Sequence, residues 1–124
     1  MKHIFIALIA MLFFLGCETT THQPHPKKHK EKYYQKKLCK KLKGIMEYRL
    51  KDKTRVDCLT DEYAIEVDFA KKWAEGIGQS LYYGYMTNRQ PAVGLICSKK
   101  DKRFLNRLKT VAKKENIKIF VIEK

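Results

Sequence analysis

Acidic residues are scarce in this sequence. Its 124 residues include 13 Asp and Glu against 27 Lys and Arg, which gives a formal net charge of +14. Residues 31–124 alone hold 23 basic and 12 acidic residues, a net of +11, so the excess does not come only from the N-terminal segment. A field of this sign favours anionic partners, namely nucleic acid, anionic lipid head groups or cell-wall polymers, and does not choose among them.

The length of the chain allows one domain. Its cysteines lack the spacings that are typical of zinc sites. The four cysteines are Cys17, Cys39, Cys58 and Cys97. If Cys17 carries a lipid, the other three allow one disulfide at most. Cys58 and Cys97 lie in apolar strand patterns, where a free cysteine usually acts as a small core residue. The pattern therefore disfavours a zinc module and leaves any cysteine pairing open.

A run of apolar residues long enough for a comfortable membrane span is absent, because the longest run covers residues 4–15. This run lies within residues 1–17, MKHIFIALIAMLFFLGC, and has the length of the apolar core of a signal peptide. The ending FLGC resembles a bacterial lipoprotein signal, in which the cysteine is acylated and becomes the new N-terminus. Phe14 departs from that pattern, which usually has leucine there.

The resemblance implies that Cys17 is lipidated and that the domain is membrane-anchored in the bacterial cell envelope, outside the cytoplasm, for example in the periplasm. An ordinary signal peptide and an uncleaved anchor are the alternatives, and each of them also exports the domain. Residues 18–30, ETTTHQPHPKKHK, are polar and without periodicity, which indicates a flexible tether. We expect the folded domain to span residues 31–124.

Hydrophobic periodicity then predicts the elements of the domain. A basic helix is expected over residues 31–43, followed by three short strands over 45–50, 54–59 and 63–69, whose short turns suit an antiparallel meander. A helix over about 71–87, a buried strand over 92–97, a helix over about 101–115 and a strand over 117–122 complete the chain. The order α-β-β-β-α-β-α-β predicts an α/β sandwich with a mixed central sheet and parallel crossovers in its second half.

Four carboxylates are candidates for a shared site. Alternation along the third strand places Glu66 and Asp68 on the same face. With the neighbouring strands in register, Glu47 and Asp57 share that face as well. Clustered carboxylates repel one another unless a cation neutralises them, and an all-oxygen site suits a hard divalent cation such as Mg²⁺.

The next helix brings polar side chains toward the same place. At about 100° per residue, Lys72, Gln79 and Tyr83 lie within roughly 40° of one another. The alternative is that the carboxylates are solvated charges on an exposed sheet face, paired with Lys72 and with arginines such as Arg49 and Arg55.

The strand order and these residues resemble the PD-(D/E)XK nuclease superfamily, whose restriction-endonuclease-like core is an α-β-β-β-α-β unit. Asp57 of RVDC corresponds to the first acid of the motif, and Glu66 of IEVD corresponds to the acid before its lysine. Glu47 is the candidate for a further glutamate that members often add. Gln79 and Tyr83 of QSLYY match the QxxxY motif of the branch that includes recombination exonucleases.

The motif departs from the family at the position of its catalytic lysine. Asp68 stands two residues after Glu66, where the family has a lysine that helps to position and activate the attacking water. Three outcomes are open: Lys72 supplies the ammonium from the helix, Asp68 adds a metal ligand, or catalysis has been lost and the fold remains.

The resemblance implies a divalent-metal-dependent nuclease that hydrolyses phosphodiester bonds of DNA with Mg²⁺ or Mn²⁺. The candidate metal ligands are Asp57, Glu66, Glu47 and, if it adds a ligand, Asp68. The candidate catalytic side chains are Gln79, Tyr83 and, if it supplies the ammonium, Lys72. Phosphate contacts are expected from the basic first helix, through Lys36, Lys37, Lys40, Lys41 and Lys43. Two other classes are open: an inactive nuclease-like module that binds nucleic acid, and an envelope protein whose basic surface binds lipid or cell wall.

Overall fold

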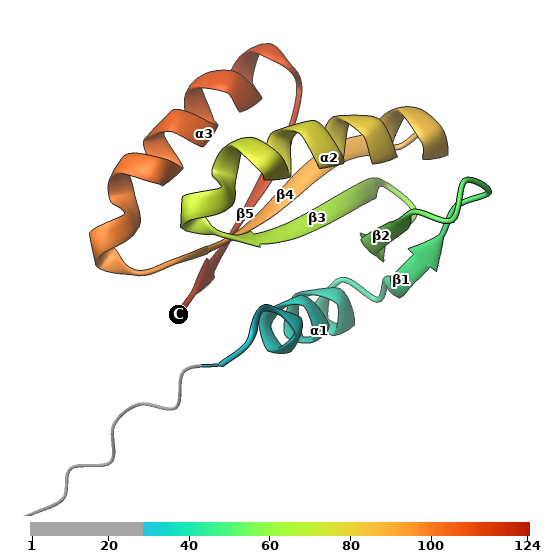
Figure 1. Ribbon diagram of the computed structural model, residues 1–124, viewed down its shortest axis with the longest axis horizontal. Coiled ribbons are helices and arrows are strands. Elements are labelled where there is room, and N and C mark those ends of the chain that lie inside the picture. Colours follow the sequence, from blue (N-terminus) through green and yellow to red (C-terminus); the bar gives the residue numbers. More distant parts are fainter. Residues whose placement is uncertain (1–28) are drawn as a thin grey trace, which may run out of the picture.

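We describe residues 29–124 of a computed structural model of the chain (Figure 1). The signal-like segment with Cys17 and nearly all of the expected tether lie outside the described residues. Among residues 29–124, no helix is long and apolar enough to cross a membrane.

The described chain has three α-helices, two short 3₁₀ helices and five strands. In order they are α1 (Glu31–Lys41), β1 (Ile45–Arg49), β2 (Arg55–Leu59), β3 (Tyr63–Phe69), η1 (Ala70–Lys72), α2 (Trp73–Thr87), β4 (Gln90–Cys97), η2 (Lys99–Asp101), α3 (Lys102–Lys114) and β5 (Lys118–Glu123). This confirms the mixed α/β class and the element order that periodicity predicts.

The five strands form one mixed sheet in the order β1-β2-β3-β4-β5. The pairs β1–β2 and β2–β3 are antiparallel, and the pairs β3–β4 and β4–β5 are parallel. The antiparallel meander and the parallel second half are thus both confirmed.

Helices cover both faces of the sheet, with α1 on one side and α2 and α3 on the other (Figure 1). On the α1 side, Tyr34 and Leu38 pack with Ile65 of β3. On the other side, Trp73 of α2 and Leu108 of α3 pack against the side chains of β4. Strand β4 is therefore buried from both faces, which explains its continuous apolar run.

A disulfide joins Cys39 of α1 to Cys58 of β2, while Cys97 is free and buried. The sequence left the pairing open, and the one disulfide that it allows forms between Cys39 and Cys58 because Cys39 is buried against the sheet. Gly44 makes this pairing possible, since a Cβ there would lie 2.5 Å from the Cys58 sulfur. The disulfide links residues 19 positions apart, and closing a loop of that length stabilises the fold by about 3 kcal/mol.

Strands β2 and β3 separate soon after the turn that joins them. They pair only at Cys58 with Ile65 and Leu59 with Ala64, while β3 pairs with β4 from Tyr63 to Phe69. Beyond this short ladder the edge of β3 faces a fork between the two strands. The candidate carboxylates lie at this fork.

Candidate functional site

Across the fork, a side chain of β2 bonds to the backbone of β3, where a paired strand would have a backbone hydrogen bond. The Val67 backbone N–H donates to the Asp57 Oδ2 at 2.8 Å, so the Asp57 carboxylate takes the place of a ladder bond. Asp57 is half-buried, and this contact with Val67 holds it beside Glu66, the residue before Val67.

Glu66 and Asp68 alternate along β3 and are almost fully buried, with exposed fractions of 6% and 4%. Helix α2 lies close over them because Gly76 has no side chain: a Cβ there would meet the Asp68 Oδ2 at 3.3 Å. One oxygen of each carboxyl, Glu66 Oε2 and Asp68 Oδ2, has no hydrogen-bond partner among the described residues. Buried polar atoms without a partner are rare and call for a bound ligand or another functional explanation.

The three carboxyls have raised pKa values because they are buried together. Burial, then the charges of Asp57 and Asp68, raise the pKa of Glu66 to about 9. Burial raises the pKa of Asp57 to about 6, against the opposing effect of the hydrogen bond from Val67. Asp57 and Glu66 also share a side-chain hydrogen bond, so they titrate as a pair.

Asp68 differs from this pair because a cation acts on it. Burial and then the charge of Glu31 raise its pKa to about 7, while Lys72 lowers it. Lys72 does not form a direct ion pair, since the only one within 4.0 Å among residues 29–124 joins Arg55 to Glu47. The carboxyl cluster is therefore not neutralised by a contacting cation of the described chain.

The cluster opens on a pocket of about 560 Å³. Its lining residues are Glu31, Glu66, Asp68, Lys72, Glu75, Gly78 and Gln79. The structure thus brings together four of the side chains that the sequence singles out, from β3, η1 and α2. The adjacent lysine, Lys71, is not in the lining. Its charge helps to lower the pKa of Asp101, which precedes α3.

The two residues of the QxxxY motif have different environments. Gln79 is exposed and lines the pocket, whereas Tyr83 is buried with Val56 and Ala64. Burial, then the charge of Glu66, raise the pKa of Tyr83, while Gln79 lowers it. Tyr83 therefore packs behind Gln79 in the core, and its hydroxyl stays neutral.

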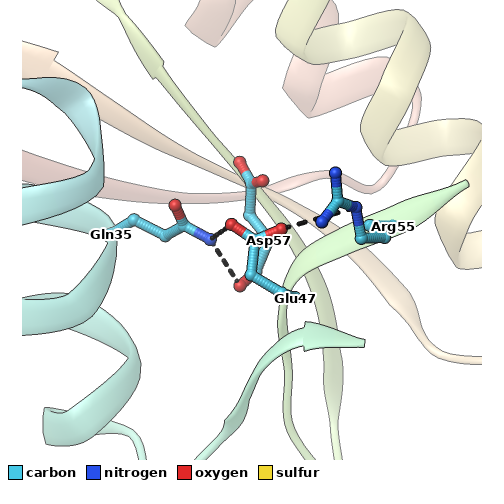
Figure 2. Close-up of polar contacts among 4 residues, drawn as sticks. All are labelled: Gln35, Glu47, Arg55 and Asp57. Carbon is cyan, nitrogen blue, oxygen red and sulfur yellow. Dashed lines mark hydrogen bonds and ion pairs between the residues drawn. The ribbon is translucent and has the colours of Figure 1, made fainter. Parts of the chain in front are cut away.

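Glu47 is not in the pocket lining, because two other residues hold its carboxylate (Figure 2). Gln35 Nε2 donates to Glu47 Oε1 at 3.1 Å and to the Asp57 backbone oxygen at 2.9 Å, and Arg55 lies 3.8 Å from Glu47 Oε2. The Glu47 backbone has a φ of 55°, in the left-handed region, where a residue other than glycine is strained. The charge of Glu47 still contributes to the raised pKa of Asp57.

Two site residues on α1 were missed by sequence reasoning, Glu31 and the buried Gln35. Their spacing of four residues places both on one face of the helix, but it does not say that this face meets the fork. The further glutamate that the family resemblance implies was sought at Glu47, while Glu31 is the one that lines the pocket.

The five lysines expected to contact phosphate all lie on exposed positions of α1 and the residues just after it. They are Lys36, Lys37, Lys40, Lys41 and Lys43. The helix buries Tyr34, Gln35 and Cys39 against the sheet, so these lysines are on its solvent side. None of them is in the pocket lining.

The donor set fits a hard divalent cation in its chemistry. It consists of carboxylate oxygens, two of them buried and without a partner among the described residues. Across residues 29–124, however, no group of three or more His, Cys, Asp or Glu side chains is arranged to hold a metal ion. The carboxyls would therefore have to converge further for a closed coordination shell.

Comparison with known proteins adds one similarity. No protein-family model and no solved structure matches the chain. A KilA-N domain-containing protein of Acanthamoeba polyphaga mimivirus is 38% identical over 61 residues, which are 49% of this chain and 17% of the viral protein. The chain therefore spans less than a fifth of this relative, and the similarity does not assign it to a family.

Proposed function

We propose that the chain is a divalent-metal-dependent nuclease of the PD-(D/E)XK type that hydrolyses phosphodiester bonds of DNA. One observation carries the proposal. Glu66 and Asp68 are buried, each has a carboxyl oxygen without a partner in the described chain, and both open on a pocket shared with Lys72. A buried carboxylate cluster without a contacting cation is a structural cost that a metal-binding function explains.

The arrangement of elements supports this assignment. The meander β1-β2-β3 followed by α2 and the parallel strand β4 has the order of the superfamily core. Asp57 lies beside Glu66 at the fork, as the first two acids of the motif require.

We assign the roles as follows. Asp57, Glu66 and Asp68 hold Mg²⁺ or Mn²⁺, and Glu31 replaces Glu47 as the further acid because it lines the pocket. The bound metal supplies Lewis-acid chemistry and lowers the pKa of a coordinated water.

The remaining pocket side chains act on the substrate. Lys72 is exposed at the pocket and has no ion-pair partner within residues 29–124, so its ammonium is free to bind the scissile phosphate. Gln79 lines the same pocket and orients the water or the nucleic-acid backbone. Tyr83 is buried outside the lining, where it packs with Val56 and Ala64 and supports the helix that carries Gln79.

The proposed location is the cell envelope, with the domain outside the cytoplasm and a lipid on Cys17. The disulfide between Cys39 and Cys58 supports it, because disulfides persist in oxidising compartments. In that location the substrate is foreign, extracellular or imported DNA. The net charge of +14 and the similarity to a viral protein with a KilA-N domain, a DNA-binding-type domain, both support a nucleic-acid partner.

A second candidate function is a nuclease-like module that binds nucleic acid without cutting it. Two observations favour it: Asp68 stands where the family has its lysine, and no group of three metal-ligating side chains is assembled within the described residues. Binding that survives chelation and the loss of Glu66 would identify this function.

The deciding experiment incubates the purified full chain with plasmid or single-stranded DNA and Mg²⁺ or Mn²⁺. We expect cleavage that EDTA abolishes and that Glu66→Gln lowers by at least about 100-fold, since the variant loses a charged ligand but keeps its shape. Glu115→Gln makes the same chemical change at an exposed position after α3 and should cut like the wild type. Equal inertness of wild type and Glu66→Gln with either metal would sink the enzyme proposal.

A further inference from the structure

The second half of α2 presents exposed aromatic and sulfur-containing side chains. Tyr82, Tyr85 and Met86 are 41%, 86% and 42% exposed, and Tyr48 of the adjacent strand β1 is 40% exposed. We call these four residues the aromatic ridge. Single exposed apolar residues are ordinary, but four neighbouring ones form a surface suited to flat ligands.

The ridge continues the exposed face of α2 that borders the carboxyl pocket. At 100° per residue, Glu75 and Gln79 of the pocket lie within about 60° of Tyr82 and Met86 around the helix axis. The rise of the helix separates Gln79 from Met86 by about 10 Å. A ligand on Tyr82 and Met86 therefore reaches the pocket along one helix face, and Tyr85 flanks this path about 60° around the helix from Tyr82.

A basic pocket adjoins the ridge, between the β1–β2 hairpin and the end of α2. It has a volume of about 410 Å³ and is lined by Tyr48, Arg49, Leu50, Lys51, Met86, Thr87 and Arg89. This lining, which lies wholly in the described chain, contains three cations and no acid. In the described chain the Arg89 Nε has no hydrogen-bond partner and its Nη1 donates to the Thr87 backbone oxygen at 3.4 Å, so the guanidinium keeps donors that an anion could use.

The hairpin is held against α2 before any ligand binds. The Tyr82 hydroxyl donates to Asp52 in the β1–β2 turn, and Asp52 also accepts hydrogen bonds from the Thr54 hydroxyl and backbone N–H. These bonds lower the pKa of Asp52 and keep it ionised. The ridge and the basic pocket thus form one preformed surface.

Gly78 lies in the lining of the carboxyl pocket and leaves open space there. A Cβ at Gly78 would meet no atom within 4 Å, so packing does not require glycine there. Glycine inside a helix is destabilising relative to alanine. A ligand backbone that passes close to the helix accounts for a glycine that the fold does not need.

We propose that this surface binds single-stranded nucleic acid, with bases stacked on the aromatic ridge and phosphates bound by Arg49, Lys51 and Arg89. Rings stack on exposed base faces, which a duplex keeps covered, and the three cations match the phosphate charge. The inference deepens the proposed nuclease function, because it names the substrate class that the ridge leads to the carboxyl pocket.

The test measures binding of the full chain, in mild detergent, to a labelled oligothymidylate of about 20 nucleotides by fluorescence anisotropy, with EDTA present. We expect Tyr85→Ala to raise the Kd roughly 5- to 100-fold and Tyr85→Phe to stay within about 2-fold. Tyr33→Ala removes a tyrosine that is 47% exposed on α1, away from the ridge, and should leave the Kd unchanged. Lys51→Ala should lower the slope of log K against log salt by about one, unlike Lys113→Ala on α3.

A Kd for Tyr85→Ala equal to that of the wild type would overturn the inference. So would a blunt duplex of equal length that competes as well as the single strand, or a Tyr85-dependent affinity for phosphatidylglycerol vesicles in place of the oligonucleotide. The nuclease proposal can fail separately. If the chain binds the single strand through Tyr85 but does not cut DNA, this inference stands and the nuclease proposal fails. If it cuts DNA and Tyr85 has no part in binding, the nuclease proposal stands and this inference fails.

Discussion

The parallel half of the sheet and its antiparallel half differ in how completely their strands are paired. Strand β3 pairs with β4 along its whole length, Tyr63–Phe69, but with β2 at only two positions. The fully paired half carries the continuous buried core, while the fork between β2 and β3 holds the unpartnered carboxyl oxygens. The difference indicates that stability is concentrated in β3–β4–β5 and that the fork is kept open for the site.

The largest effect is expected from damage to the parallel half. Leu95 of β4 is fully buried, so Leu95→Ala should lower the free energy of unfolding by about 2–5 kcal/mol. Urea denaturation of the variant and the wild type measures this. Val121→Ala on β5 is the matched control, because Val121 is half exposed and should cost much less. Equal losses would contradict the view that the buried side chains of β4 carry the stability of this half.

The antiparallel half should depend instead on its covalent link. Reduction of the Cys39–Cys58 disulfide should cost about 3 kcal/mol and lower the melting temperature by roughly 10–20 °C. Hydrogen exchange on the reduced chain should show faster exchange in α1, β1 and β2 than in β4. Protection lost evenly across the sheet would contradict this. Cys97→Ala, which touches no disulfide, serves as the control.

The carboxyl cluster should make the metal-free chain less stable as pH rises. The folded pKa values of Glu66 and Asp68, about 9 and about 7, lie above their ordinary values of 4.5 and 3.8. The folded state therefore binds more protons than the unfolded chain above about pH 4. Its advantage is fully present below that pH and is lost progressively until the pH has passed about 7 for Asp68 and about 9 for Glu66.

In EDTA, we expect the wild-type melting temperature to fall by about 5–10 °C between pH 5.5 and pH 9, which corresponds to about 1–2 kcal/mol. Glu66→Gln should flatten this dependence, because it removes the group with the highest pKa of the cluster. Differential scanning fluorimetry across the pH range measures both. A Glu66→Gln profile as steep as that of the wild type, or as that of Glu115→Gln, would show that the cluster does not cause the slope.

The smallest effect is expected at Gly78, where stability and binding should change in opposite directions. Gly78→Ala should stabilise the chain by about 0.5–1 kcal/mol, because the new methyl group meets no atom and the helix gains propensity. The same variant should bind single-stranded oligonucleotide more weakly. Thermal melting and anisotropy on one preparation test the pair of effects. Gly76→Ala differs, since a Cβ at Gly76 would lie 3.3 Å from the Asp68 Oδ2.

Local patterns predicted the elements well, because each pattern depends on neighbours in sequence. Alternation in YAIEVDF placed Glu66 and Asp68 on one face, and both lie at the pocket. Helical periodicity likewise placed Lys72 and Gln79 beside them, from η1 and α2. These predictions needed only the period of a strand and of a helix.

Features that depend on how distant elements cross were not predictable in the same way. Glu31 reaches the pocket, and Cys39 meets Cys58, because of the place at which α1 crosses the open fork. Glu47 was expected in the cluster, but a left-handed backbone and Gln35 hold it aside. Neither the crossing of a helix nor a local break in a strand leaves a periodic signal in sequence.

The position of the disulfide decides how the domain would respond to mechanical tension. A force that pulls on the N-terminal side of α1 can unwind the helix only as far as Cys39, where a covalent bond passes the force to β2, next to Asp57. Glu31 lies ahead of that bond, and Asp57 lies behind it. Tension would therefore draw away the outer wall of the carboxyl pocket first, while the strand that carries Asp57 stays attached to the sheet.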